Sequence, residues 1–379
     1  MHIKYKINNN DYNVTFYKDD IVKNFSKKIK SKSEISKNLD KLKHDKKILL
    51  AIDRKINKQI IQNLIKFIAT DNIEMKILYI DGSKKNKNLK TLFKIINCLF
   101  KNKFTKNSVL ISCGGGVIGD VSGLSASLYL RGLNYMHIPT TMTAIIDSCI
   151  GGKNGVNFNN LINSLGTYYH PQNVYILKSI IECQPKREYI SGIPEIIKCG
   201  LIKRSNLLSH IENKNKVLKR DFLFVSKLIK ETLNIKIKFF KNDIEEKEER
   251  LMLNFGHTFA HAIESALDNN IKNKKEILRH GEAVGLGLLC EIFYSNGKNK
   301  IFYKVRDLLS LYSLPINLKN IDINKNFLIK EIFKFIFYDK KKIGKFPRYI
   351  NLQKIGNSKI DELRNHERII QTIENVLFS

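Results

Sequence analysis

The stretch SVLISCGGGVIGD, residues 108–120, constrains the fold more than any other part of the chain. Its apolar first half is typical of a buried strand, and consecutive glycines then permit a tight turn into a helix. A strand, glycine turn and helix in this order favour a parallel sheet, and the helix N-terminus favours a bound anion such as phosphate. The motif departs from the usual G-x-G-x-x-G pattern, so a turn that binds nothing is about as compatible with it.

Strand and helix patterns alternate around this stretch. Strands are expected at 48–53, 75–82 and 135–141, and helices at 57–69 and 88–101. This alternation predicts an α/β, Rossmann-like dinucleotide-binding domain over residues 1–180. Helical patterns dominate from about residue 186, which predicts an all-α metal-binding domain over residues 181–379, with the boundary near 175–185.

Two segments of the N-terminal half carry polar groups at strand ends, where ligands bind in such sheets. Asp53 ends an early strand, and it would either meet a ribose hydroxyl or cap the next helix. Residues 138–158, IPTTMTAIIDSCIGGKNGVNF, offer hydroxyls, an acid, glycines and a lysine after another strand. A glycine-rich loop without a ligand is the alternative, but the lysine within it favours a binding role.

The segment SGIPEIIKCGLI, residues 191–202, has the signals of a helix start. Ser191 is expected to cap the helix, and Pro194 suits its first turn. Glu195 and Lys198 are three residues apart and therefore share a face. A surface ion pair is the simplest interpretation of that spacing.

The segment LNFGHTFAHAIE, residues 253–264, contains two histidines four residues apart. On one continuous helix, Arg250, Asn254, His257, His261 and Glu264 would form a single stripe. A solvated face is the common explanation of a polar stripe, but histidine and asparagine in place of lysine favour a lined cavity.

A third histidine, His280, follows in the segment HGEA. One carboxylate and two imidazoles would make a zinc-type site with open positions, as catalytic metal sites require. The residue types alone do not identify which two histidines would bind the metal.

The overall composition narrows the classes of function and location that are compatible with the chain. The chain has 66 Lys and Arg against 36 Asp and Glu, a formal charge of +30. Lysine, asparagine and isoleucine crowd every loop, so compositional bias explains this charge better than nucleic-acid binding does. The six cysteines are scattered without a C-x-x-C pair, which argues against a disulfide scaffold. Without a signal-peptide pattern or a membrane-length apolar run, a cytoplasmic location is expected.

Taken together, the motifs resemble those of the 3-dehydroquinate synthase family, within the sugar-phosphate cyclase superfamily. GGGVIGD, PTT with DSCIGGKNGVN, Asn163 to Pro171, REYISGIPEIIKCGLI, LNFGHTFAHAIE, HGEAVG and DKK occur in the family's order over about residues 50–345.

The resemblance implies a reaction and two cofactors. The substrate would be 3-deoxy-D-arabino-heptulosonate 7-phosphate, and the products 3-dehydroquinate and phosphate. NAD would oxidise a hydroxyl and later return the hydride, with Zn2+ or Co2+ as a Lewis acid. Another sugar-phosphate cyclase or a metal-dependent polyol dehydrogenase is the alternative, and net NADH release would distinguish the latter. Arg250 and Lys236 favour a substrate that carries a carboxylate.

The resemblance also assigns residues. The metal ligands would be Glu195, His257 and His280. The catalytic residues would be His261, Glu246, Lys153, Asp147 and Lys198. Substrate would be bound by Arg131, Asn163, Lys236, Arg250, Asn254 and Lys340, the last with its neighbour Lys341. The cofactor would be bound by Asp53, Lys87, Gly115, Gly116, Val117, Gly119, Asp120, Thr140, Thr141, Lys153 and Cys183.

Arg131 matches an arginine that reaches the site of a neighbouring subunit, which implies a homodimer. Three positions depart from the family pattern: Ile162 and Lys84 replace a lysine and a glutamate, and Cys183 replaces a threonine. All three match positions that touch NAD, so the hypothesis is weaker NAD binding with the chemistry retained.

Overall fold

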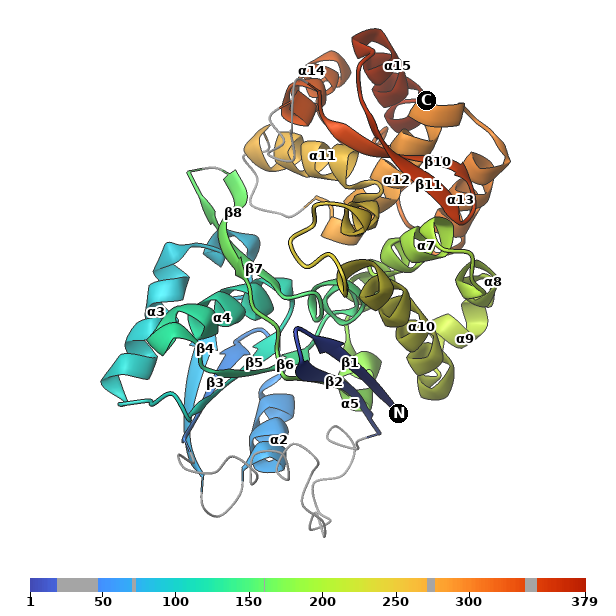
Figure 1. Ribbon diagram of the computed structural model, residues 1–379. Helices are drawn as coiled ribbons and strands as arrows, with labels where there is room; N and C mark the ends of the chain where they lie inside the picture. Colours follow the sequence, from blue (N-terminus) through green and yellow to red (C-terminus); the bar gives the residue numbers. More distant parts are fainter. Residues whose placement is uncertain (19–46, 70–72, 160, 271–276, 338–345) are drawn as a thin grey trace. The chain divides into compact units, whose positions relative to one another are not determined.

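The computed structural model describes residues 1–18, 47–69, 73–159, 161–270, 277–337 and 346–379 (Figure 1). The chain divides into two compact units, Met1–Pro185 and Lys186–Ser379. None of the helices in these ranges combines the length and the apolar composition that a membrane crossing requires.

A seven-stranded sheet forms the centre of the N-terminal unit within the described residues, in the order β1-β2-β9-β6-β5-β3-β4. The strands are β1 (His2–Ile7), β2 (Asn10–Tyr17), β3 (Lys47–Asp53), β4 (Glu74–Ile80), β5 (Val109–Gly114), β6 (Asn134–Pro139) and β9 (Asn173–Leu177). Neighbouring strands run parallel except at the β1–β2 pair, which is antiparallel. The predicted α/β, Rossmann-like architecture is confirmed.

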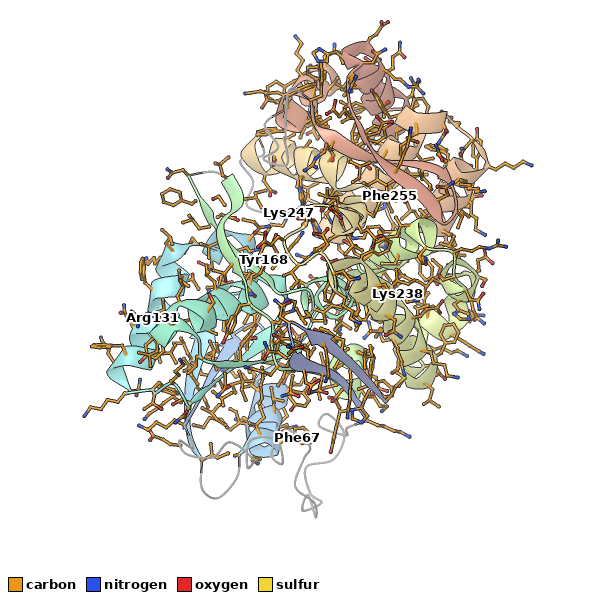
Figure 2. All side chains as sticks on the ribbon, in the orientation of Figure 1. Phe67, Arg131, Tyr168, Lys238, Lys247 and Phe255 are labelled. Atoms are coloured by element: carbon orange, nitrogen blue, oxygen red, sulfur yellow. The ribbon has the colours of Figure 1, made fainter. Side chains whose placement is uncertain are left out.

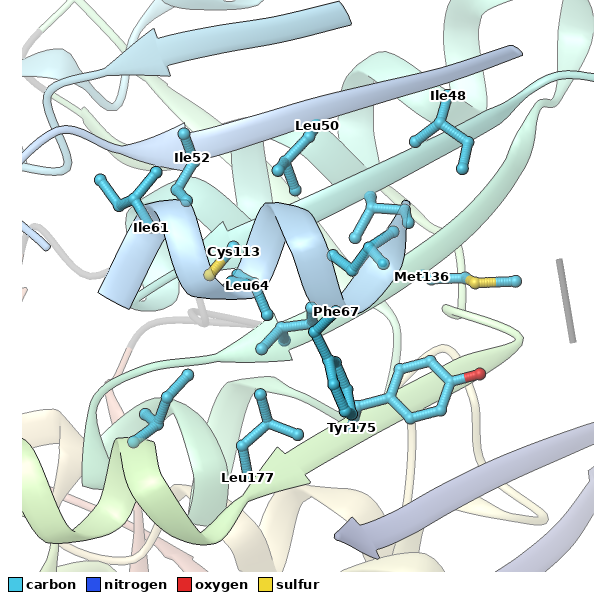
Figure 3. Packing of buried hydrophobic residues seen from close by; sticks show 14 of the residues in the cluster. Ile48, Leu50, Ile52, Ile61, Leu64, Phe67, Cys113, Met136, Tyr175 and Leu177 are labelled. Atoms are coloured by element: carbon cyan, nitrogen blue, oxygen red, sulfur yellow. The ribbon is translucent and has the colours of Figure 1, made fainter. Parts of the chain in front are cut away.

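Helices connect these strands at positions close to those expected. They are α2 (Lys58–Ile68), α3 (Leu89–Lys101), α4 (Gly116–Leu128) and α5 (Lys178–Cys183), with short turns η1 (Lys84–Asn86), η2 (Tyr129–Arg131) and η3 (Ala144–Ser148). The α2 side chains of Ile61, Leu64 and Phe67 pack on Leu50 and its neighbours in β3 (Figure 3). The opposite face of β3 packs against α3. Burial on both faces explains why β3 is continuously apolar.

A second hairpin follows the sheet, made of β7 (Lys153–Phe158) and β8 (Leu161–Tyr168). The sequence patterns predict neither this hairpin nor the β1–β2 pair. Strand β8 is exposed along most of its length and lacks the alternation of apolar and polar residues that marks a half-buried strand.

The C-terminal unit is helical, as predicted. Its helices are α6 (Lys186–Ile190), α7 (Ile193–Ile202), α8 (Leu207–Glu212), α9 (Lys214–Leu218), α10 (Phe222–Phe240), η4 (Glu249–Asn254), α11 (His257–Asn270), α12 (His280–Asn296), α13 (Lys300–Leu311), α14 (Lys325–Phe337) and α15 (His366–Leu377). It also contains a hairpin that the sequence patterns do not predict, β10 (Arg348–Lys354) and β11 (Asn357–Glu362). Helix α12 is buried along nearly its whole length and packs against α7, α11, α13, α15 and β10.

Candidate metal and substrate site

Helix α7 carries the first acidic residue of the site. The helix begins after Gly192, so the expectation that Ser191 caps it is wrong; the Ser191 hydroxyl instead donates to the Glu188 carbonyl at 2.9 Å. Pro194 lies in the first turn, as expected, because a residue there needs no amide proton. Glu195 follows it directly and is buried within the unit.

Glu195 and Lys198 are not a surface ion pair. Each side chain is only 1% exposed, and the Lys198 Nζ lies 2.5 Å from the Glu195 Oε2. Removing two charges from water costs several kcal/mol, at an order of magnitude, unless further polar partners surround them. A buried pair of this kind therefore indicates a functional site more than a stabilising contact.

The polar stripe expected over residues 250–264 is broken into two elements. Residues Glu249–Asn254 form η4, Phe255 is extended, and Gly256 has a φ of +80° before α11 begins at His257. A Cβ on Gly256 would lie 2.9 Å from the Leu288 backbone nitrogen, so glycine is needed for both conformation and space. The expectation of one continuous helix is wrong, because the chain must turn here to pack on α12.

The start of α12 is held tightly against the start of α7. A Cβ on Gly281 would lie 1.6 Å from the Ser191 carbonyl oxygen, so only glycine permits this approach. Glu282 accepts the Arg279 backbone amide at 2.8 Å and binds both Nε and Nη2 of Arg187, at 2.8 and 2.7 Å. The HGEA segment thus fixes the position of His280, the first residue of the helix.

These constraints bring one carboxylate and two imidazoles together from three helices. The Glu195 Oε1 lies 3.6 Å from the His257 Nε2 and 3.8 Å from the His280 Nε2. One ligand atom from each residue lies within 4.8 Å of the others. These are the distances expected around the position of one shared ion, and the donor set is that of a catalytic zinc site.

The surroundings of Glu195 fit a cation. Lys198 approaches one oxygen closely, yet neither carboxylate oxygen has a hydrogen bond of normal geometry among the described residues. A buried carboxylate in this state is costly. A divalent ion held between Glu195, His257 and His280 would satisfy it.

His261 and Glu264 lie beside this cluster, one and two turns along α11 from His257. The rings of His261 and His280 are 6.0 Å apart between centroids, and the rings of His261 and His257 are 5.4 Å apart. The His280 Nδ1 is 2.9 Å from the Glu264 Oε2, and Glu264 is buried. A carboxylate there orients the ring so that Nε2 faces Glu195. The residue assignments from sequence omit Glu264, although its seven-residue spacing from His257 places both on one helical face.

The loop between α10 and η4 is organised by hydrogen bonds to the Asp243 carboxylate. Burial raises the pKa of Asp243, but hydrogen bonds from the backbone amides of Lys247, Glu248 and Arg250 outweigh burial and lower it. These three hydrogen bonds fold the loop around the Asp243 side chain. The Arg250 Nη1 donates to the Ile244 carbonyl at 2.5 Å.

Three other residues assigned from sequence are Glu246 in this loop, Asn254 at the end of η4 and Lys236 on α10. The Asn254 Nδ2 donates to the Glu246 Oε1 at 2.7 Å, so the structure brings these two together. Lys236 is buried on α10, which packs against α7. Lys340 lies outside the described residues.

In the N-terminal unit, part of the assigned set lies at the carboxyl ends of parallel strands. Asp53 accepts the backbone amides of Lys55 at 3.0 Å and Gly82 at 3.3 Å, so it closes the ends of β3 and β4. It does not cap α2, because Asn57 does. A Cβ on Gly115 would lie 3.2 Å from the Thr141 Cγ2, so the β5–α4 turn and the β6 loop are in contact.

Two charged residues of this edge form a pair. Lys87 binds Asp120 on α4, and the pKa of Asp120 is raised because burial outweighs the lysine. The nearby Asp147 on η3 raises it further. Helix α4 begins directly after Gly115, without a side-chain cap, and a phosphate at its N-terminus stays a prediction.

The other assigned residues of this unit are placed as follows: Gly116, Val117 and Gly119 on α4, Thr140 after β6, Lys153 on β7, Asn163 on β8, Arg131 on η2 and Cys183 at the end of α5. Arg131 and Cys183 are exposed, and Figure 2 labels Arg131. The Thr140 amide donates to the Gly114 carbonyl at 3.0 Å.

Comparison with known proteins gives a consistent result. The family model for the N-terminal part of 3-dehydroquinate synthase matches residues 77–191, and the model for its C-terminal part matches residues 192–342. The 3-dehydroquinate synthase of Pelagibacter ubique is 38% identical over 327 residues, 85% of this chain and 86% of the relative. That of Dictyoglomus thermophilum is 36% identical over 299 residues, 79% of this chain and 82% of the relative.

Solved structures agree on the fold. The 2-epi-5-epi-valiolone synthase of Streptomyces hygroscopicus, with NAD+ and Zn2+ bound, has a TM-score of 0.80 at 21% identity, over 96% of both chains. A 2-deoxy-scyllo-inosose synthase complexed with carbaglucose-6-phosphate, NAD+ and Co2+ has the same TM-score and identity, over 100% of both chains.

Proposed function

The chain belongs to the 3-dehydroquinate synthase family and has that family's activity, and we propose that it acts at the cluster of Glu195, His257 and His280. The reaction converts 3-deoxy-D-arabino-heptulosonate 7-phosphate to 3-dehydroquinate and phosphate. The observation that carries the proposal is the convergence of one buried carboxylate and two imidazoles from three helices within 4.8 Å.

Zn2+ or Co2+ would be held by Glu195, His257 and His280, and when bound it polarises the reacting hydroxyl and ketone as a Lewis acid. Lys198 lies against Glu195 in the buried interior, and we assign it a hydrogen bond to the substrate oxygen beside the metal. His261 is one helical turn from His257 and belongs to a second group with Glu264 and His280, not to the group of Glu195, His257 and His280. We assign it to proton transfer, together with Glu246.

The substrate carries a carboxylate and a phosphate, which need cations. Lys236 and Arg250 are buried in the same unit as the metal cluster, and Asn254 lies close to Glu246. Charge-assisted hydrogen bonds of roughly 1.5–3 kcal/mol each would hold the extended substrate in a folded shape. Holding its two reacting ends together lowers the barrier to ring closure.

NAD would bind at the strand-end edge of the N-terminal unit, and when bound it takes up a hydride and later returns it. The α4 N-terminus and the glycines before it would bind the pyrophosphate. Asp53 would accept a ribose hydroxyl from the end of β3, the position such an acid occupies in this fold class.

We also propose a homodimer with Arg131 near the interface. Large apolar side chains are exposed on both sides of this arginine in η2 and the end of α4, at Leu128 and Leu130, and along β8, at Leu161, Ile162, Leu165 and Tyr168. The Thr167 hydroxyl donates to Ser127 at 2.9 Å, which links β8 to the end of α4 just before η2. Apolar surface of this kind is typical of a contact between subunits.

The proposed function is tested by incubating the pure enzyme with NAD, zinc and the heptulosonate phosphate. We expect one phosphate and one 3-dehydroquinate per substrate, with no net NADH. Accumulation of NADH in proportion to substrate would contradict the proposal, since a polyol dehydrogenase would release it.

A further inference from the structure

A basic cleft in the C-terminal unit lies outside the residues assigned to catalysis. It has a volume of about 410 Å³ and runs between α10 and the segment after α7. Its lining residues are Lys203, Arg204, Ser205, Lys227, Lys230, Glu231, Asn234, Ile235 and Lys238, and Figure 2 labels Lys238. Lys236 is nine residues from Lys227, two and a half helical turns, and therefore projects from the opposite, buried side of α10.

The cleft is more basic than the composition of the chain explains. Five of its nine lining residues are Lys or Arg, whereas 66 of 379 residues in the chain are, so fewer than two would be expected. Within the described part of the chain, none of the five forms an ion pair with a carboxylate. The one acidic residue of the lining is Glu231. Its Oε1 accepts the Asn206 backbone amide at 3.2 Å, and its Oε2 lies 3.5 Å from the His210 Nδ1.

Helix electrostatics explains part of this charge. Lys203 and Arg204 follow the C-terminal end of α7, where the helix dipole favours cations. Lys227 and Lys230 lie in the second and third turns of α10, where the dipole gives no such reason. They share the cleft with three further cations, Lys203, Arg204 and Lys238, and like charges this close repel one another when no anion is bound.

We propose that this cleft binds a small polyphosphate anion, independently of the proposed function. Its volume is within the range of small-molecule pockets, roughly 300–1,000 Å³. The lining includes no aromatic side chain, so it lacks the stacking surface on which single-stranded nucleic acid depends. Recognition rests on charge, which selects a compact ligand with several negative groups. A free polyphosphate and a nucleoside triphosphate share this chemistry.

The test is calorimetric titration of the NAD-loaded enzyme with inorganic tripolyphosphate. The variant replaces Lys227, Lys230 and Lys238 by Gln. A matched control replaces Lys298, Lys300 and Lys319 by Gln, which changes the net charge equally at exposed sites of the same unit. The active-site cations are intact in both, so a difference between the two variants reports on the cleft.

We expect the cleft variant to bind tripolyphosphate about tenfold more weakly, as the loss of three screened charge contacts predicts, and the control to bind within about twofold of the natural chain. Equal weakening in both variants would overturn the proposal, since bulk charge would then explain binding; so would no weakening in either. Tighter binding of ATP than of tripolyphosphate identifies a nucleotide as the ligand, and equal or weaker binding identifies the free anion. Binding of a single-stranded oligonucleotide without binding of tripolyphosphate would also overturn it.

Discussion

Two histidines one helical turn apart occupy different chemical positions in this protein. His257 has its Nε2 3.6 Å from the Glu195 carboxylate, whereas His261 belongs to a second group with Glu264 and His280. Helical spacing alone would favour a pair of ligands of the H-x-x-x-H kind. The neighbours of each ring, which come from other helices, separate their roles.

We expect His257→Ala to lose the metal and His261→Ala to keep it. Metal content after dialysis against a weak chelator measures the first effect, and turnover of metal-loaded enzyme measures the second. His261→Ala should lose about 100-fold or more in turnover, as general acid–base residues typically do. Equal loss of metal in both variants would show that the two histidines form a clamp.

Glu264 is predicted to position His280 by accepting its Nδ1–H. Glu264→Ala should weaken metal affinity about 10- to 100-fold, the usual effect of removing such a partner. Glu264→Gln should lose less, because the amide oxygen can still accept. Competition with a chromogenic chelator measures the affinity.

Asp322→Ala, at an exposed position before α14 in the same unit, is the control and should match the natural chain. If Glu264→Ala also matches it, Glu264 does not orient the ligand.

At the scale of elements, close packing between helices places the ligands. The turn before α11 packs directly on the backbone of α12 at Gly287. A Cβ on Gly287 would lie 1.9 Å from the Gly256 carbonyl oxygen, so only glycine permits this contact. The residue before α7, Ser191, packs equally closely on the backbone of α12 at Gly281. Three helices therefore present their first turns to one place.

Gly256→Ala is expected to destabilise the protein by about 3 kcal/mol or more, measured by urea denaturation. It combines a positive φ, which costs roughly 1–2 kcal/mol for a residue with a Cβ, with a clash against Leu288. Gly297→Ala is the matched control, because Gly297 has a φ of +65° and a Cβ there would meet no other atom within 4 Å. The control should show the conformational cost alone, about 1–3 kcal/mol, because its φ of 65° and ψ of −158° lie in a region almost confined to glycine. Similar losses at both positions would contradict the role of packing at Gly256.

At the scale of the whole molecule, subunit association is predicted from the exposed apolar side chains beside Arg131 and along β8. Replacing Leu161 and Leu165 together by Glu should produce monomers in sedimentation velocity, because charge would have to be buried in the contact. Phe100→Glu is the control, since Phe100 is 72% exposed on α3. A dimer that survives the double replacement would contradict the proposed interface.

The stability of the protein should also depend on pH through His137, which is buried in β6. Burial lowers the pKa of His137 to about 4, so the folded chain keeps the ring neutral while the unfolded chain takes up a proton below about pH 6.5. The unfolded state then binds more protons, and the free energy of unfolding falls as the pH drops from about 6.5 toward 4. The loss from this group is of the order of 3 kcal/mol at most.

Urea denaturation at pH 7 and pH 5 measures this dependence. His137→Asn retains a polar atom near the Ser112 hydroxyl, which lies 2.7 Å from the His137 Nδ1, but cannot be protonated in this range. It should show a smaller difference between the two pH values than the natural chain. An unchanged difference would exclude His137 as the source.

The local sequence by itself determined most secondary-structure elements of the N-terminal unit and the candidate residues of the site. Apolar runs and glycine turns predict the parallel sheet and its helices, because strand and helix periods are read from neighbouring residues. The residue types of the motifs around Glu195, His257 and His280 predict a metal site, and the family resemblance predicts these three residues as its ligands. The exposed strand β8 and the hairpin β10–β11 escape prediction, since their patterns resemble loops.

Tertiary structure decided the rest. The sequence spacing predicts one helix through residues 250–264 and a surface ion pair at Glu195 and Lys198, and both predictions are wrong. Burial and packing against α12 depend on residues far away in the chain, which periodicity does not encode. The same long-range packing gives Glu264 its position beside His280 and brings Lys203 and Arg204 beside the lysines of α10.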